Sequence, residues 1–123
     1  MHLVGLVGFQ DYYPHQISGG MAQRVAIARA LATDARCLLM DEPFASVDYQ
    51  TKQTLFRELQ HLRRERGLTI LYVTHDLRDA IQFSDVIFVL SARPGRVLET
   101  IRPTQRDLGN SPLEERLWTL LRE

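Results

Sequence analysis

An acidic pair, Asp41 and Glu42, comes directly after the apolar run 37–40 and directly before Pro43. Four apolar residues in a row predict a strand that is buried on both faces of a parallel sheet, with the two carboxylates at its carboxyl end. Phosphoryl transfer uses carboxylates in two roles, because one holds Mg²⁺, usually through water, and another orients or deprotonates the attacking water. The alternative is that Asp41 and Glu42 have no catalytic role, because acidic residues are also ordinary at the ends of strands.

Two further short motifs could serve the same chemistry. Ser18, Gly19 and Gly20 precede a helical run, and two glycines at a helix start let a ligand approach free N–H groups that favour an anion. His75 follows the next apolar run and could donate a hydrogen bond to a phosphate oxygen. Each motif also has an ordinary explanation, since Ser18 can be a plain N-cap and a lone histidine at a strand end is weak evidence.

The elements that must position these residues alternate between strand and helix. Strand patterns and helix patterns follow one another in the order 37–40, 49–66, 69–74, 77–83 and 85–90. This order predicts an α/β layer fold with right-handed crossovers, in which chemistry collects at the carboxyl ends of the strands. Asp41, Glu42 and His75 stand at two such ends.

The remaining elements are an edge strand and a final helix. Residues 97–101 predict a strand that pairs antiparallel with 85–90 across the turn 93–96. After a polar linker, Ser111 is expected to cap the last helix, with Pro112 at its first position and Glu114 placed for a capping box.

Length and charge narrow the function classes. The 123 residues suit one domain, and 15 Lys and Arg balance 15 Asp and Glu, which argues against a nucleic-acid grip and a polybasic membrane patch. The sequence predicts no signal peptide, and no apolar run approaches the ~18 residues of a membrane span. The single cysteine, Cys37, stands in an apolar run and is predicted to be a buried thiol.

The motifs gain weight from their order. The string 18–31 is followed by 37–43, then by Ala45-Ser46-Val47-Asp48 and by the strand that ends at His75. In order and spacing this string, which extends from residue 14 to about 101, resembles the ATP-binding subunit of ABC transporters, and a long ordered string is far more specific than its pieces. The resemblance implies an α/β fold, namely a P-loop NTPase-like (RecA-like) parallel sheet flanked by helices.

The resemblance implies a role for each matching residue near the helix start. Ser18, Gly19 and Gly20 resemble the signature motif, which in the family contacts the γ-phosphate of ATP held by the opposite subunit. Met21 departs from the commonest glutamine of that motif, and Gln23 lies two residues further on and is taken as part of the same ATP-binding set.

The resemblance also implies roles at the strand ends. Asp41 looks like the Walker B aspartate near Mg²⁺, Glu42 like the general base and His75 like the switch histidine that senses the γ-phosphate. Residues 45–48, which end at Asp48, look like the D-loop that crosses the dimer interface. By the same resemblance, residues 1–17 are the end of the helical subdomain, 18–103 are the C-terminal part of the ATPase core, and 104–123 are a linker and helix.

A finer resemblance concerns the transported solute. Met21 in the signature run, the triplet 13–15 and the turn 93–96 are similar to importers of nitrate, sulfonate, taurine and related solutes. The implied partners are a second ATP-binding subunit, transmembrane permease subunits and, indirectly, a solute-binding protein, with no nucleic acid. The implied location is cytoplasmic and peripheral on the inner face of the cell membrane, with ATP and Mg²⁺ as ligands.

The sequence contains no Walker A loop, the glycine-rich run ending in Lys-Ser or Lys-Thr that grips the β- and γ-phosphates. Its one lysine, Lys52, stands in a helical pattern without glycine nearby, and no Q-loop can be placed. The family has both elements upstream of the signature motif, and its Walker A strand lies between the strands 69–74 and 85–90. We therefore expect a C-terminal portion with an incomplete sheet, apolar surface left open and weak ATP binding in its own site.

Three other functions stay open from the sequence. The chain could be a non-catalytic remnant that at most supplies Ser18–Gly20 in trans. It could be a DNA-handling ATPase of the same broad kind, which predicts a basic groove that the neutral charge disfavours. It could also be a plain doubly wound binding module with an accidental motif string.

Overall fold

The structure is a computed structural model, and it describes residues 5–109 and 112–122. The chain divides into two compact units, Met1–Val73 and Thr74–Glu123. Each unit has its own hydrophobic cluster and is described by itself.

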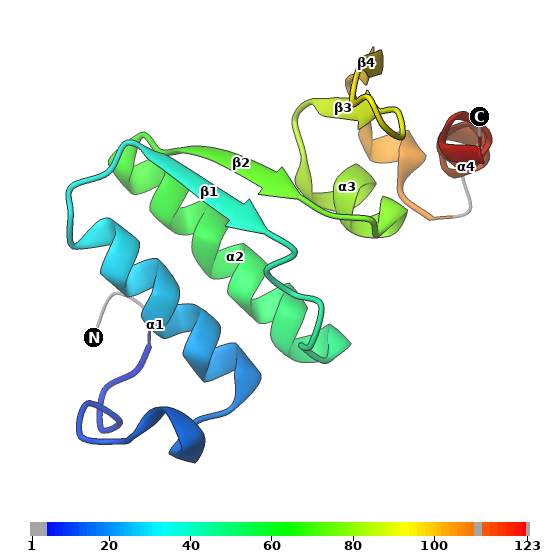
Figure 1. Cartoon of the computed structure of the whole chain (residues 1–123). Helices are drawn as coiled ribbons and strands as arrows, with labels where there is room; N and C mark the ends of the chain where they lie inside the picture. Colours follow the sequence, from blue (N-terminus) through cyan, green and yellow to red (C-terminus); the bar gives the residue numbers. More distant parts are fainter. Residues whose placement is uncertain (1–4, 110–111, 123) are drawn as a thin grey trace. The chain divides into compact units, whose positions relative to one another are not determined.

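The first unit is a strand–helix–strand segment preceded by a helix. After a short 3-10 helix, η2 (Pro14–Gln16), its elements are α1 (Gly19–Leu31), β1 (Cys37–Asp41), α2 (Tyr49–Arg66) and β2 (Thr69–Val73). β1 and β2 pair in parallel, with Cys37 opposite Thr69 and Asp41 opposite Val73. Both helices lie on the same side of this sheet, and they run side by side with their N-termini at the same end (Figure 1).

Local signals at both ends explain the bounds of α2. The carboxylate of Asp48 accepts a hydrogen bond from the backbone N–H of Thr51 and so caps the N-terminus. Gly67 ends the helix in the left-handed region with φ 63°, which suits a residue without a β-carbon. The predicted helix 49–66 is confirmed.

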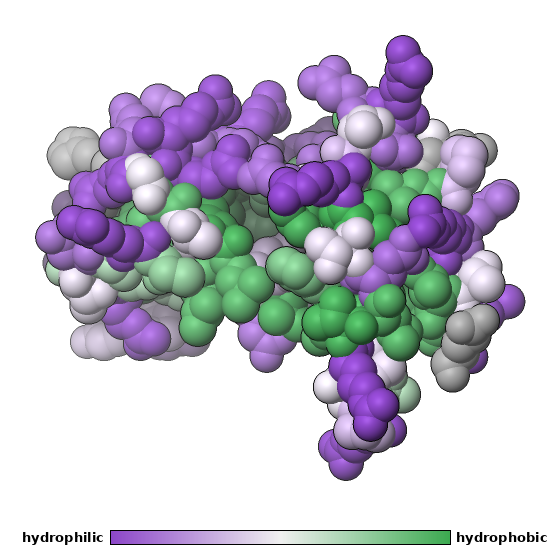
Figure 2. Space-filling view, turned by 90° about the horizontal axis from the view of Figure 1, so that it is seen from above, coloured by the Kyte–Doolittle hydropathy of each residue, from purple (hydrophilic) through white to green (hydrophobic). Residues whose placement is uncertain are grey.

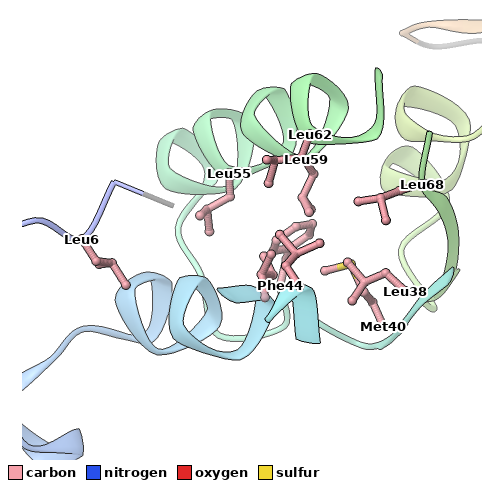
Figure 3. Close-up of a cluster of buried hydrophobic side chains, with 10 residues drawn as sticks. Leu6, Leu38, Met40, Phe44, Leu55, Leu59, Leu62 and Leu68 are labelled. Carbon is pink, nitrogen blue, oxygen red and sulfur yellow. The ribbon is translucent and has the colours of Figure 1, made fainter. Parts of the chain in front are cut away.

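The core of the first unit lies between the sheet and the helices. Leu55, Leu59 and Leu62 of α2 point into the cluster, the ring of Phe44 lies near its centre, and Leu38 and Met40 enter it from β1 (Figure 3). The side chains of Leu55 and Leu59 are only 1% and 2% exposed. Fully burying such a side chain contributes about 1.5–3 kcal/mol, so this cluster fixes the strand end that follows Met40.

The opposite face of the same sheet is open, which corrects two expectations. Burial alternates along β1, and Leu39 is 71% exposed while its neighbours Leu38 and Met40 are buried. The prediction of a strand buried on both faces is therefore wrong, because helices cover only one face of this two-stranded sheet. Cys37 lies on the open face, so the predicted buried thiol is exposed. Figure 2 shows hydrophobic residues open to view among hydrophilic ones.

The second unit is a hairpin packed with two helices. Its elements are α3 (Leu77–Phe83), β3 (Ile87–Leu90), β4 (Val97–Ile101), the short 3-10 helix η3 (Gln105–Asp107) and α4 (Pro112–Arg122). β3 and β4 pair antiparallel as predicted, although β3 begins two residues later than the sequence pattern suggested. Ile81, Val89 and Leu117 lie in its buried cluster. Ser111, expected to cap α4, falls outside the described residues.

The strands in the described part of the chain form two separate two-stranded sheets, β1–β2 and β3–β4. Among the described residues, no helix has both the length and the apolar character that crossing a bilayer requires.

Candidate functional site

The first part of the candidate site is the start of α1, formed by Ser18, Gly19 and Gly20 and called the signature segment from here on. Ser18 has extended backbone angles, and its Oγ accepts a hydrogen bond from the N–H of Met21 at 3.2 Å. Ser18 and Gly19 are exposed, and the first turn of α1, which the structure describes in full, carries no acidic side chain. The exposed helix start therefore suits an anion such as a phosphate.

The start of α2 lies directly against the signature segment. A β-carbon at Gly20 would lie 2.7 Å from Cγ2 of Thr51, and one at Gly19 would lie 3.6 Å from the carbonyl oxygen of Ser46. The structure thus brings the predicted signature residues together with the segment 45–48, two motifs that stand far apart in the sequence.

Asp48 caps the N-terminus of α2 by accepting two hydrogen bonds from Thr51. Its Oδ2 accepts from the Thr51 hydroxyl at 2.6 Å, and its Oδ1 accepts from the Thr51 N–H at 3.0 Å. These bonds, the hydroxyl bond first, stabilise the carboxylate and lower the pKa of Asp48 below its ordinary 3.8. Asp48 is therefore an anionic cap whose geometry depends on Thr51.

The acidic pair lies at the carboxyl end of β1, as its sequence position predicted. Asp41 is the last residue of β1 and is exposed. Glu42 is half-buried, has φ 44° and donates its backbone N–H to the carbonyl oxygen of Val73 at 2.8 Å. A left-handed backbone costs a residue with a β-carbon roughly 1–2 kcal/mol, and strain of this kind collects at functional sites.

His75 stands at the start of the second unit and is exposed. The N–H of Asp76 binds the Thr74 hydroxyl at 3.0 Å, while the Asp76 carboxylate caps α3 by accepting from the N–H of Arg78 at 2.9 Å. The backbone beside His75 is therefore held by its neighbours. Glu42 belongs to the first unit, so the meeting of these two side chains around one phosphoryl group stays a prediction.

Comparison with known proteins shows the family to which this chain belongs. Residues 1–45 match the family described as ABC transporter. An uncharacterized ABC transporter ATP-binding protein of Methanocaldococcus jannaschii is 51% identical over 100 residues, which cover 81% of this chain and 38% of that protein. The chain belongs to the ABC transporter ATP-binding proteins.

Two relatives of this ABC chain are named as importers. The nitrate import ATP-binding protein NrtD of Synechocystis sp. is 44% identical over 97 residues, which cover 79% of this chain and 36% of that protein. The aliphatic sulfonates import ATP-binding protein SsuB of Bacillus cereus is 42% identical over 118 residues, or 94% of this chain and 47% of that protein. The ABC chain therefore spans less than half the length of these relatives.

A solved ATP-binding cassette shares the fold. The dimeric, post-hydrolysis structure of a cassette bound to ADP and Pi superposes with a TM-score of 0.68 at 35% identity, covering 84% of this chain and 44% of that chain. The predicted α/β P-loop NTPase fold is confirmed, and the ABC chain corresponds to its C-terminal portion.

Sequence reasoning missed three residues, Arg24, Glu58 and Thr51, that form contacts between α1 and α2. Gln23, predicted to belong to the signature motif, is half-buried on α1, and its neighbour Arg24 forms an ion pair with Glu58 of α2 at 3.1 Å. No local pattern links residues 34 positions apart. Thr51 was detectable as a partner of Asp48, since a capping residue often bonds the N–H three residues on, but its contact with Gly20 was not.

The magnesium ion at Asp41 stays a prediction, and the exposed carboxylate there is compatible with it. Within residues 5–109 and 112–122, no group of three or more His, Cys, Asp or Glu side chains could enclose a metal by itself. Mg²⁺ in phosphate sites needs only one or two carboxylates, because water and phosphate oxygens complete its coordination. Asp41 is an exposed carboxylate of that kind, with Glu42 as its neighbour.

Proposed function

We propose that this chain is the catalytic portion of an ATP-hydrolysing subunit that powers an ABC importer. Glu42 orients and deprotonates the attacking water, and Asp41 holds Mg²⁺ through water. The observation that carries the proposal is the left-handed backbone of Glu42, pinned to the end of β2 by its bond to Val73. A glutamate has no intrinsic preference for that conformation, and a strained backbone at the end of a strand supports a functional role for this position.

The other site residues act on the phosphate. The signature segment, with Gln23 behind it, presents the N-terminus of α1 to the γ-phosphate of ATP held by the opposite subunit, where exposed N–H groups and the helix dipole stabilise negative charge. His75 donates a hydrogen bond to the same phosphoryl group, and the loop ending at Asp48 crosses to the partner subunit. Bound Mg²⁺ supplies positive charge that offsets the charge of the phosphate oxygens.

The proposed enzyme needs a phosphate-gripping loop that these 123 residues do not contain. Lys52, the one lysine, lies on α2 and cannot serve as the lysine of a glycine-rich loop. The grip on the β- and γ-phosphates must therefore come from residues outside this sequence, and the working unit is a dimer of complete cassettes.

The proposed solute is nitrate, a sulfonate or a related compound such as taurine. The names of the Synechocystis and Bacillus cereus relatives support this range. The partners are a second ATP-binding subunit and transmembrane permease subunits, with a solute-binding protein as an indirect partner, on the cytoplasmic face of the membrane.

A composite cassette tests the proposal. The portion of the Methanocaldococcus jannaschii relative that precedes the matched region would be joined to this chain, and ATP hydrolysis and ATP-driven dimerisation would be measured. We expect hydrolysis in the parent composite and its loss, by a factor of about 10² or more, in Glu42→Gln, with dimerisation retained. The matched control is Glu65→Gln, the same change on an exposed side chain of α2.

Two results would refute the role of Glu42. One is a Glu42→Gln composite that hydrolyses ATP at the parent rate. The other is a folded, dimeric parent composite without hydrolysis.

A second candidate is a non-catalytic chain that only supplies the signature segment in trans, because Ser18 and Gly19 at the start of α1 are exposed. This candidate predicts that the chain by itself does not hydrolyse ATP. Hydrolysis by the isolated chain that disappears in Glu42→Gln would exclude it.

A further inference from the structure

Gly20 and Thr51 are in closer contact than any residue with a β-carbon at position 20 would allow. A β-carbon there would lie 2.7 Å from Cγ2 of Thr51, 3.8 Å from Cδ1 of Leu55 and 4.0 Å from Oγ of Ser18. Only the first distance is shorter than van der Waals contact. The γ-methyl of Thr51 therefore sets how closely the signature segment approaches α2.

The Thr51 methyl cannot easily turn away. Threonine is β-branched, so its γ-methyl moves only by rotation about χ1, and that rotation also moves Oγ1. Oγ1 donates to Asp48 at 2.6 Å, and the Thr51 N–H donates to the same carboxylate at 3.0 Å. Rotation would therefore break the 2.6 Å bond from the Thr51 hydroxyl to Asp48, while the N–H bond that caps α2 would remain.

The helix that carries Thr51 is equally fixed. Leu55 lies one turn further along α2, is 1% exposed and belongs to the buried cluster of the first unit. Moving α2 away from α1 would open that cluster, which packs at high density and does not yield without cost.

We propose that Thr51 is a positioning residue for the signature segment. Its methyl, locked by the Asp48 carboxylate, sets the depth at which Gly20 rests on α2, and this depth sets where Ser18 presents its helix start. The D-loop cap and the signature segment of one chain are thereby joined through a single side chain. The link to catalysis rests on the proposed function, whereas the contact itself does not.

The effect of Gly20→Ala on stability tests the contact in the full chain, because the contact should turn a normally stabilising change into a destabilising one. Alanine normally favours a helix over glycine, so Gly20→Ala would stabilise α1 if space allowed. With the Thr51 methyl in place, we expect Gly20→Ala to raise the unfolding equilibrium constant roughly tenfold, as overpacking does. Adding Thr51→Ser, which keeps the hydroxyl and removes the methyl, should remove that rise. Adding Thr51→Val, which keeps a methyl, should leave the rise caused by Gly20→Ala in place.

Gly19→Ala is the matched control, because its β-carbon would make only ordinary contacts of 3.6 Å with Ser46. We expect it to change the unfolding constant by less than about threefold, with or without Thr51→Ser. Two results would overturn the proposed contact: Gly20→Ala without a rise in the unfolding constant, or equal rises in the presence of Thr51→Ser and of Thr51→Val.

Hydrogen exchange then reads the position of the signature segment itself. The N–H of Met21 donates to Ser18, so its exchange rate reports the helix start. We expect Gly20→Ala to accelerate this exchange about tenfold and Thr51→Ser to restore it, because a misplaced start loses the cap. Restored stability without restored protection at Met21 would overturn the positioning role.

Hydrolysis in the composite cassette separates this inference from the proposed function. In an active composite, kcat should fall in Gly20→Ala and recover with Thr51→Ser. Recovered protection at Met21 without recovered kcat would overturn the link to catalysis. A parent composite without hydrolysis would defeat the proposed function, while unfolding and exchange would still decide the role of Thr51.

Discussion

The backbone N–H of Glu42 donates to the carbonyl oxygen of Val73 at 2.8 Å, one residue beyond the last paired residue of β1. The bond extends the parallel ladder while Glu42 already has φ 44°. The neighbouring strand end thus holds the backbone of Glu42 although its conformation is unfavourable for a glutamate. A carboxylate fixed to a packed element in this way is better placed for catalysis than one on a free loop.

Substitutions that differ only in the β-carbon can measure the strain at Glu42. Glu42→Ala and Glu42→Gly both remove the carboxylate and its contacts, but only alanine keeps a β-carbon that opposes positive φ. We expect the glycine variant to be more stable than the alanine variant by about 1 kcal/mol, measured by urea unfolding.

Ala45, three residues on, provides the control for that comparison. It is not among the non-glycine residues with positive φ in the described chain. Ala45→Gly should therefore lower the free energy of unfolding by roughly 0.5–1 kcal/mol. If the alanine form were more stable than the glycine form at position 42 as well as at position 45, the backbone of Glu42 would not be strained.

Acid stability should depend on Asp48. The hydroxyl and N–H of Thr51 lower the pKa of its carboxyl below 3.8 in the folded chain, so this ionised cap contributes stability above pH 3.8. That stability is lost as the pH falls through the lower folded value. We expect the urea midpoint of the parent to drop in this window, and we expect a smaller drop in Asp48→Asn, which retains a capping oxygen without the titration.

Thr51→Val provides a second test of how the titration of Asp48 affects acid stability. It removes the hydroxyl bond that is the largest cause of the lowered pKa of Asp48. The folded pKa of Asp48 then lies closer to 3.8, so the acid loss of stability should be smaller than in the parent and should end at a higher pH. Part of the slope will remain in every variant, because the Thr104 hydroxyl also lowers the pKa of Asp107. Identical acid profiles in the parent, Asp48→Asn and Thr51→Val would contradict the prediction.

The features that sequence predicted correctly rest on local chemistry. Asp48 and Gly67 bound α2, and Ser18 caps α1, because capping depends on residues within one turn. The strand ends that hold Asp41 and Glu42 were placed by short apolar runs, which are local as well.

The features that the sequence did not predict depend on contacts between residues that are far apart in the sequence. An apolar run cannot reveal that only one face of β1 is covered, so Leu39 and Cys37 were wrongly expected to be buried. The contact of Gly20 with Thr51 joins positions 31 residues apart, counted from their residue numbers. The left-handed Glu42 was hidden because glutamate has no preference for that region.

The open face of β1 can be tested with one substitution made on both faces. Leu39→Thr should change the free energy of unfolding by less than about 0.5 kcal/mol, because Leu39 is 71% exposed and threonine favours strands. Leu38→Thr should cost about 2–5 kcal/mol, because Leu38 is 6% exposed within the core. Urea unfolding provides both values, and equal losses would mean that the outer face is covered.

The same open face should make Cys37 chemically accessible. Cys37 is the first residue of β1 and is exposed together with Leu39 and Asp41, the alternate residues of that strand. A thiol reagent such as Ellman's reagent should therefore modify the folded chain at a rate within about tenfold of the urea-unfolded chain, since reactivity follows exposure once the thiolate forms. Cys37→Ser is the control and should show no reaction. A thiol that reacts only after urea is added would place Cys37 in the interior and reverse the assignment of the two faces of β1.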